Sequence, residues 1–147
     1  MTRKLNLGCG PYKKEDYINI DVNFQQQPDL VRDVRKGLPY DDGSVEKVLA
    51  CHFLEHLLPY EALNLIEEVY RVLMPSGLFT VVVPLGATGL LDHLHAYTSR
   101  SFDNLCLLES AAYYNRSFRW RLVSKEVRPD DLPWNTESLH VVLEAIK

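Results

Sequence analysis

The alternation of apolar and polar residues predicts strands near the start of the chain. Residues 4–7 and 18–22 alternate in this way, which is typical of strands that bury one face only. A further short strand is expected over residues 30–34. Residues 45–51 and 78–83 are instead near-continuous apolar runs, and such runs favour the central strands of a parallel sheet. The pattern therefore places the centre of a sheet at these two runs.

Apolar residues between the two central strands recur at helical spacing. Their positions are Ala62, Leu65, Ile66, Val69 and Leu73. Pro59 stands near the first turn of this predicted helix, and a Pro-Ser-Gly triplet at residues 75–77 is expected to close it. Strand, helix and strand with short connections predict a right-handed parallel crossover, and hence an α/β sheet.

The second half of the chain predicts one more helix and a terminal pair of strands. The helical positions are Phe102, Leu105, Leu108 and Ala112. Residues 118–127 and 139–146 are β-rich, and a polar loop with prolines joins them, so an antiparallel pair is expected. No repeat or linker interrupts the sequence, and its length suits one domain. Residues 1–147 are therefore predicted to form a single domain.

Two glycines and an aspartate give the first indication of chemistry. Gly8 and Gly10 follow the first predicted strand, and Asp21 stands at the end of the second. Glycines in such a turn let the backbone approach a ligand closely, and a carboxylate on the next strand can accept hydrogen bonds from both hydroxyls of a ribose. Strand, glycine turn, strand and acid therefore predict a nucleotide pocket.

Several further motifs follow one another in a fixed order. In the sequence they are residues 5–10 (LNLGCG), 20–21 (ID), 33–35 (DVR), 38–40 (LPY), 51–56 (CHFLEH) and 68–77 (EVYRVLMPSG). Together they closely resemble the class I S-adenosylmethionine-dependent methyltransferases of the type 11 group, over about residues 4–84. The resemblance implies a Rossmann-like, mostly parallel sheet of seven strands in the order 3-2-1-4-5-7-6, with the last strand antiparallel.

The resemblance also implies a set of cofactor-binding residues. Gly8 and Gly10 would line the methionine part of S-adenosylmethionine, which becomes S-adenosylhomocysteine. Asp21 would bind the ribose hydroxyls, and Asp33 would accept a hydrogen bond from the adenine amino group; both are alternatively turn residues. Asn6 departs from many relatives, which carry an acid there, so weaker binding is expected. The candidates are Asn6, Gly8, Cys9, Gly10, Asp21, Val22, Asp33, Val34, Cys51, His52 and Leu54.

Two connections are shorter than this family pattern requires. About ten residues separate Gly10 from Asp21, where a unit with a helix needs about twenty, and the third glycine of the fingerprint is absent. Residues 22–29 are also too few for a helix. We therefore expect the first crossover helices to be shortened or missing and one face of the sheet to be poorly covered. A homodimer, or another partner, is expected to cover that face.

The segment Asp92-His93-Leu94-His95 is the candidate for the acceptor site. It resembles the type 11 segment in which an aspartate and a histidine face the substrate, matching Asp92 and His95. A histidine that titrates near neutral pH can accept a proton from a nucleophile, so His95 is the predicted catalytic base. Asp92, His95 and Tyr97 are the predicted substrate-binding residues. A surface loop with solvated histidines, and a tyrosine in the core, is the alternative interpretation.

Histidines in this segment also suit a metal ion. Asp92, His93 and His95 have a spacing that permits ligation on an extended segment. No third or fourth ligand can be predicted from the sequence, however, and structural zinc sites usually show cysteine pairs. No metal is therefore predicted. Glu55 and His56 are expected near the floor of the pocket, with a structural role, because a glutamate is favourable near the start of the following helix.

Composition narrows the function further. The net charge of -4 disfavours nucleic acid as a partner and suits a cationic sulfonium ligand. The three cysteines lack paired spacing, and no secretion signal precedes the first strand, so a reduced, cytoplasmic protein is expected. The apolar runs are too short to cross a bilayer, and no membrane partner is expected.

These features lead to one main hypothesis and two alternatives. The chain is predicted to be an S-adenosylmethionine-dependent methyltransferase (EC 2.1.1.-) that methylates an O or N atom of an unidentified small-molecule acceptor. The first alternative is a non-catalytic cofactor-binding or interaction subunit with the same fold, suggested by the trimmed helices and Asn6. The second is a nicotinamide-dependent oxidoreductase, which shares the glycine turn and the acid; the missing third glycine and Asp33 count against it.

Overall fold

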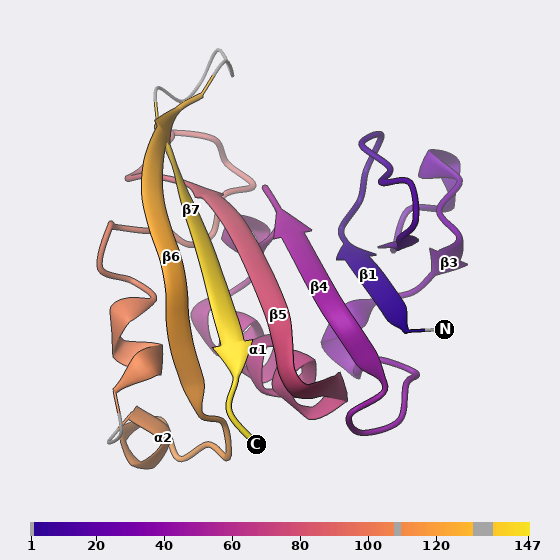
Figure 1. The fold of residues 1–147 in the computed structure, drawn as a ribbon. Helices are drawn as coiled ribbons and strands as arrows, with labels where there is room; N and C mark the ends of the chain where they lie inside the picture. Colours follow the sequence, from indigo (N-terminus) through magenta and orange to yellow (C-terminus); the bar gives the residue numbers. More distant parts are fainter. Residues whose placement is uncertain (1, 108–109, 131–136) are drawn as a thin grey trace.

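Seven strands form one mixed sheet in the order β3-β2-β1-β4-β5-β7-β6 (Figure 1). The computed structural model describes residues 2–107, 110–130 and 137–147. The strands are β1 Arg3–Leu7, β2 Ile18–Asp21, β3 Leu30–Val31, β4 Val45–Cys51, β5 Leu73–Pro84, β6 Trp120–Pro129 and β7 Glu137–Ala145. The first five are parallel to their neighbours among themselves, and β7 runs antiparallel to both β5 and β6. The predicted fold class is therefore confirmed.

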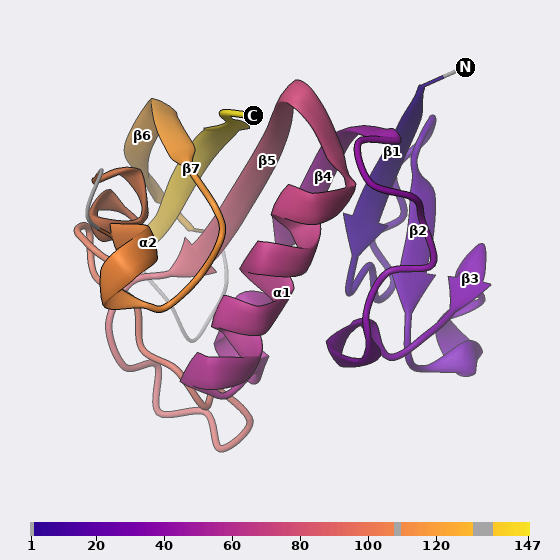
Figure 2. The same ribbon diagram turned by 90° about the horizontal axis from the view of Figure 1, so that it is seen from below.

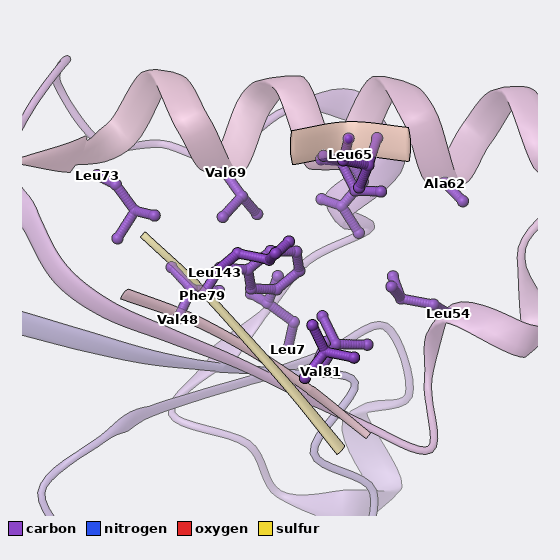
Figure 3. Packing of buried hydrophobic residues seen from close by; sticks show 14 of the residues in the cluster. Leu7, Val48, Leu54, Ala62, Leu65, Val69, Leu73, Phe79, Val81 and Leu143 are labelled. Carbon is purple, nitrogen blue, oxygen red and sulfur yellow. The ribbon is translucent and has the colours of Figure 1, made fainter. Parts of the chain in front are cut away.

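Helix α1, Pro59–Val72, packs on one face of this sheet. Its buried residues are spaced by three and four positions, which gives one apolar stripe along the helix. They are Ala62, Leu65, Ile66, Val69 and Val72. Figure 3 shows Leu65 and Val69 pointing from the helix towards Phe79 and Leu143 on the strands. The stripe predicted from the sequence therefore forms the helix side of the core.

The helices α1 and α2 lie on the same side of the sheet (Figure 2). Strand side chains alternate between the two faces. On β4 and β5, Val48 and Phe79 are buried on the helix side, whereas Lys47 and Thr80 alternate with them and remain partly exposed. No helix in the described part of the chain covers the opposite face, and the homodimer expected on that ground stays a prediction.

The segment after β2 contains turns in place of a second crossover helix. Residues Phe24–Gln26 form the 3-10 turn η1, and β3 ends at Val31, earlier than predicted. The reason is Asp33, whose carboxylate accepts a hydrogen bond from the amide of Arg35 and begins the 3-10 turn η2, Val34–Lys36. The chain therefore turns where the sequence pattern predicted a longer strand.

The second predicted helix is divided into two short elements. They are the 3-10 turn η4, Asp103–Cys106, and helix α2, Ser110–Tyr113, while Leu108 lies outside the described residues. The first helix also differs at its end, because β5 begins at Leu73 and residues 75–77 belong to that strand. None of the helices in residues 2–107, 110–130 and 137–147 has the length and apolar character needed to span a membrane.

A hydrogen-bonded loop replaces the first crossover helix between β1 and β2. Its centre is the buried side chain of Asn19. The Oδ1 atom of Asn19 accepts from the Lys14 amide at 2.8 Å and from Asn6 Nδ2 at 2.9 Å. Its Nδ2 atom donates to the main-chain oxygens of Lys14 and Tyr17 and to Asp29 Oδ2. One carboxamide thus holds the loop that follows the glycine turn.

Replacing Asn19 by alanine is expected to lower the free energy of unfolding by about 2–4 kcal/mol, since each buried polar group left unpaired costs about 1–3 kcal/mol. The donors left without this partner are the Lys14 amide and one N–H of Asn6, and the acceptors are the main-chain oxygens of Lys14 and Tyr17 and the Asp29 carboxylate. Denaturant unfolding measures the change. The control is Asn64→Ala on the exposed face of α1, which is expected to shift stability by no more than about 0.5 kcal/mol. Equal losses in both variants would contradict the role of Asn19.

Candidate functional site

Two adjoining cavities open at the carboxyl ends of β1, β2 and β4, the edge where open α/β sheets bind ligands. The first cavity has a volume of about 670 Å³ and the second of about 740 Å³. Gly8, His52, His56 and Asp92 line both of them. The two cavities therefore meet at these residues.

Asp21 is fixed at the wall of the first cavity by two main-chain amides. Its Oδ2 atom accepts from the Gly10 amide at 2.8 Å, and its Oδ1 atom accepts from the Asn23 amide at 2.8 Å. A carboxylate oxygen can accept a second hydrogen bond. Asp21 is therefore held in place and can still accept from a ligand diol. Val22, which follows it, is exposed and also lines this cavity.

The two glycines of the turn differ in what surrounds them. Gly8 has a φ of +61°, and a Cβ atom added there would lie 2.1 Å from Cδ2 of Phe53. Gly10 has a φ of +49°, but an added Cβ would meet no described atom within 4 Å. The protein's own packing thus requires glycine at residue 8, whereas the space beside Gly10 is open to a ligand.

Asp33 lines the first cavity but already has a strong partner. Its carboxylate pairs with the Arg35 guanidinium through two contacts of 2.9 Å. This hydrogen bonding holds the pKa of Asp33 below its usual value. An adenine amino group at this place would share the carboxylate with Arg35. Val34 is buried beside it in the same wall.

Asn6, Cys9 and Cys51 line the second cavity. Asn6 is buried, and its Nδ2 atom donates to the Tyr12 main-chain oxygen at 3.2 Å as well as to Asn19. Both N–H groups are therefore engaged in holding the loop. Burial raises the pKa of the Cys9 thiol, which agrees with a packing role.

His52 stands between two carboxylates where the cavities meet. Its Nδ1 atom lies 3.6 Å from Glu55 Oε1, and its Nε2 atom lies 3.4 Å from Asp130 Oδ2. The neighbouring Glu55 raises the pKa of His52, and burial opposes the shift. His52 has a φ of +50°, and its amide donates to Val82 at 2.8 Å. The imidazole is therefore biased towards its protonated form.

Leu54 and Tyr97 lie in the core and not in the walls of these two cavities. Leu54, in the 3-10 turn η3 (Leu54–His56), is fully buried. The Tyr97 hydroxyl donates to the Leu54 main-chain oxygen at 3.4 Å, and its ring stacks on Phe102. Burial raises the pKa of Tyr97. Their predicted contacts with cofactor and substrate remain untested, and the positions favour packing.

The predicted acceptor segment is divided between neighbouring cavities. Asp92 is exposed and lines the first and second cavities, and His93 lines the second. His95 instead lines an adjoining cavity of about 220 Å³, together with the loop around Gly86. Burial lowers the pKa of His95, and no described group bonds its Nδ1 atom. Its role as the catalytic base stays a prediction.

Sequence reasoning missed several cavity residues. Phe53, Gln26, Arg32 and Arg35 all line the first cavity. Phe53 belongs to the CHFLEH motif, so its neighbour His52 was an available signal. Gln26 and Arg32 offered none, because their positions depend on how the short turns after β2 fold. His56 was expected near the pocket floor, and it lines both cavities.

The strand order matches the Rossmann-like methyltransferase fold of solved S-adenosylmethionine-dependent methyltransferases. The methyltransferase domain family matches residues 10–81 of the chain. This match and the similar folds of solved methyltransferases agree with the class I S-adenosylmethionine-dependent methyltransferases of the type 11 group, which the sequence motifs resemble. A search of curated proteins gives no match.

Solved structures with a similar fold agree with this family. A methyltransferase from Methanosarcina mazei is 14% identical with a TM-score of 0.74, over 98% of this chain and 92% of that one. The complex between the Haloferax volcanii Trm112 activator and a methyltransferase is 14% identical with a TM-score of 0.71, over 99% of this chain and 83% of that one. A third similar structure is the 1,6-didemethyltoxoflavin-N1-methyltransferase of Burkholderia thailandensis with bound 1,6-didemethyltoxoflavin and S-adenosylhomocysteine. It is 13% identical with a TM-score of 0.68, over 98% of this chain and 71% of that one. At these identities the likeness shows the fold.

Proposed function

We propose that the chain binds S-adenosylmethionine in the first cavity and transfers its methyl group to an O or N atom of a small molecule in the second. The observation that carries the proposal is Asp21, whose carboxylate is held by the Gly10 amide at the wall of the first cavity. A carboxylate in this place can accept both ribose hydroxyls in charge-assisted hydrogen bonds. The similar fold of a Burkholderia methyltransferase with bound S-adenosylhomocysteine supports this assignment.

The shape of the site supports one orientation of the cofactor. The adenosine part would lie in the first cavity, with its ribose at Asp21 and its adenine beside Val34. The sulfonium would then lie where the cavities meet, near Gly8 and His52. The reactive methyl group would thereby face the second cavity.

Charge favours the substrate form of the cofactor at this junction. Glu55, Asp92 and Asp130 line the second cavity, against Lys14 and the His52 imidazole. An excess of carboxylates attracts the positive sulfonium, and S-adenosylhomocysteine carries no charge at its sulfur. The same field would therefore bind the methyl donor and release the product more readily.

The transfer is a single displacement. The lone pair of the acceptor atom forms a bond to the methyl carbon while the carbon–sulfur bond breaks, and that electron pair returns to the sulfur. Alignment of the two reactants in adjoining cavities supplies most of the acceleration. An acceptor that loses a proton needs a base, and His95 would serve only after its loop brings the ring into the second cavity.

Titration calorimetry tests the proposal directly. S-adenosylhomocysteine is expected to bind at one site per chain, and NAD is expected to give no heat, because the cleft has the acid for a ribose but lacks the third glycine of the dinucleotide fingerprint. Binding of NAD without binding of S-adenosylhomocysteine would support the oxidoreductase alternative and overturn the proposal.

The non-catalytic subunit is the second candidate function. It is favoured by the loop that replaces the first crossover helix and by Asn6, whose donors are already engaged. A similar structure is a complex between a methyltransferase and the Trm112 activator, so members of this fold do assemble with partners. Turnover of a labelled methyl donor in cell extract separates the two functions, since a non-catalytic subunit would bind the donor without consuming it.

A further inference from the structure

Three metal-ligating side chains from two separate segments gather beside the second cavity. Glu55 and His56 lie in the turn η3, whereas His93 lies on the loop after β5. One ligand atom from each lies within 4.8 Å of the others, and the two imidazole rings are in edge contact. The main-chain amides of Leu94 and His95 both donate to the Glu55 carbonyl oxygen, at 2.7 Å and 3.1 Å. The fold thus fixes this loop against the turn.

Glu55 is the group that points to a ligand. Its side chain is 1% exposed, and neither carboxylate oxygen has a hydrogen-bond partner among the described residues. The His52 Nδ1 atom lies 3.6 Å from Oε1 in a long ion pair, and His52 shares its charge with Asp130. A buried carboxylate is costly unless hydrogen bonds or a cation compensate it. This carboxylate is therefore suited to a positive ion that reaches both the turn and the loop.

The two histidines are oriented as metal ligands usually are. The Nδ1 atom of His56 lies 3.0 Å from the Asp92 main-chain oxygen, and that of His93 lies 2.8 Å from the Thr88 hydroxyl. Metal-binding histidines commonly donate one ring N–H to a protein oxygen, which fixes the tautomer and leaves the other nitrogen free. The Nε2 atoms of His56 and His93 would accordingly serve as the ligand atoms.

We propose that Glu55, His56 and His93 bind a divalent transition-metal ion, and that this ion coordinates an oxygen of the methyl acceptor. The second part rests on the proposed function. Two imidazoles and one carboxylate with open positions are a donor set used by catalytic zinc and by non-haem iron. Bonds of about 2.0–2.2 Å place such ligand atoms about 3–3.5 Å apart, so the three side chains would move together by about 1 Å.

The ion would activate a hydroxyl group. Glu55, His56 and His93 all line the second cavity, so the open coordination positions face the acceptor. Coordination lowers the pKa of a bound hydroxyl, whose proton then leaves to solvent. The oxygen lone pair forms the bond to the methyl carbon, and the carbon–sulfur electron pair returns to sulfur. The site therefore favours an oxygen acceptor and requires no side-chain base.

The same grouping explains why the sequence led to no metal prediction. The spacing of Asp92, His93 and His95 suggested ligation within one segment, with the remaining ligands unknown. In the structure His95 lines the adjoining cavity, and the further ligands come from the CHFLEH motif. Only the return of the loop over the turn η3 brings them together.

Metal titration of the full chain tests the site. Protein without an affinity tag is stripped with a chelator and titrated by calorimetry with Mn²⁺, Co²⁺ and Zn²⁺ in separate experiments. At least one of these three ions is expected to bind at one site per chain. Glu55→Gln and His93→Asn are each expected to weaken binding at least about tenfold, because each removes one of three protein ligands. The matched control is His95→Asn, two residues along the same loop, which is expected to keep the wild-type affinity.

A second titration of the same samples with S-adenosylhomocysteine separates the two proposals. Metal binding without S-adenosylhomocysteine binding would overturn the proposed function and keep the ion site. S-adenosylhomocysteine binding with no metal binding would overturn the ion site alone, as would equal metal affinities of His93→Asn and His95→Asn. Should Glu55→Gln fail to fold by circular dichroism, His93→Asn decides, because His93 is half-buried on a loop.

Discussion

Asp21→Ala is expected to weaken the binding of S-adenosylhomocysteine by about 10- to 150-fold. Charge-assisted hydrogen bonds contribute about 1.5–3 kcal/mol, and each 1.4 kcal/mol is a tenfold change in affinity. The variant also frees the amides of Gly10 and Asn23, so the glycine turn loses its anchor and the loss should approach the upper value. Asp21→Asn keeps the shape of the side chain without its charge, so its affinity for S-adenosylhomocysteine should lie between those of the wild type and Asp21→Ala. Titration calorimetry at constant pH measures all three proteins.

Asp41→Ala is the matched control for this experiment. Asp41 is exposed and lines neither cavity, and its main-chain oxygen, not its carboxylate, accepts the hydrogen bond from Ser44. The variant has the same change in net charge as Asp21→Ala, so it corrects for the general field of the protein. Equal affinities of the two variants would mean that the carboxylate at the end of β2 does not hold the ribose, and the proposed function would fail.

The sheet could be predicted because several independent signals agreed. Residues 45–51 and 78–83 are apolar runs, and the positions of α1 repeat at helical spacing, so strand, helix and strand followed from elementary patterns. The order of the strands depended on the family motifs, because periodicity alone does not say which strands pair. The elements predicted least well are short turns such as η2, where one side chain, Asp33, decides the backbone path.

The site was predicted as a neighbourhood but not as a set of contacts. Asp21 and the two glycines lie in the first cavity, since a strand end and its turn are fixed by local sequence. The CHFLEH motif is different, because His52 adopts a φ of +50°, which residues other than glycine rarely adopt. That turn directs Leu54 into the core. The direction of consecutive side chains could not be derived from the motif itself.

Long-range closure is the part of the site that sequence reasoning could not reach. His56 and His93 meet because the loop after β5 returns to the turn η3, where the Glu55 carbonyl oxygen accepts two of its amides. No hydrophobic periodicity or local motif around His56 or His93 indicates this contact. A main-chain hydrogen bond has no signature in residue type, so the pairing of the segments appears only in three dimensions.

Substitution of the two glycines of the turn by alanine should lower the free energy of unfolding by clearly different amounts. Gly8→Ala is expected to lower the free energy of unfolding by about 2–5 kcal/mol, because a left-handed backbone costs a side-chain residue about 1–2 kcal/mol and overpacking adds about 1–3 kcal/mol. The overpacking arises from Phe53, whose Cδ2 atom would lie 2.1 Å from the new Cβ. Gly10→Ala meets open space and should lose only the backbone part, about 1–2 kcal/mol.

A second substitution shows whether Phe53 is the cause of that difference. Phe53→Leu removes the aromatic ring that a Cβ at residue 8 would meet. The loss of unfolding free energy due to Gly8→Ala should therefore be smaller in the Phe53→Leu background than in the wild type. The loss due to Gly10→Ala should be the same in both backgrounds. Double-mutant cycles measured by denaturant unfolding test both expectations. If the two glycine variants lose equal stability in the wild-type background, Gly8 is required by its backbone conformation alone. The close approach at β1 would then be available to the cofactor, and Phe53 would have no part in setting it.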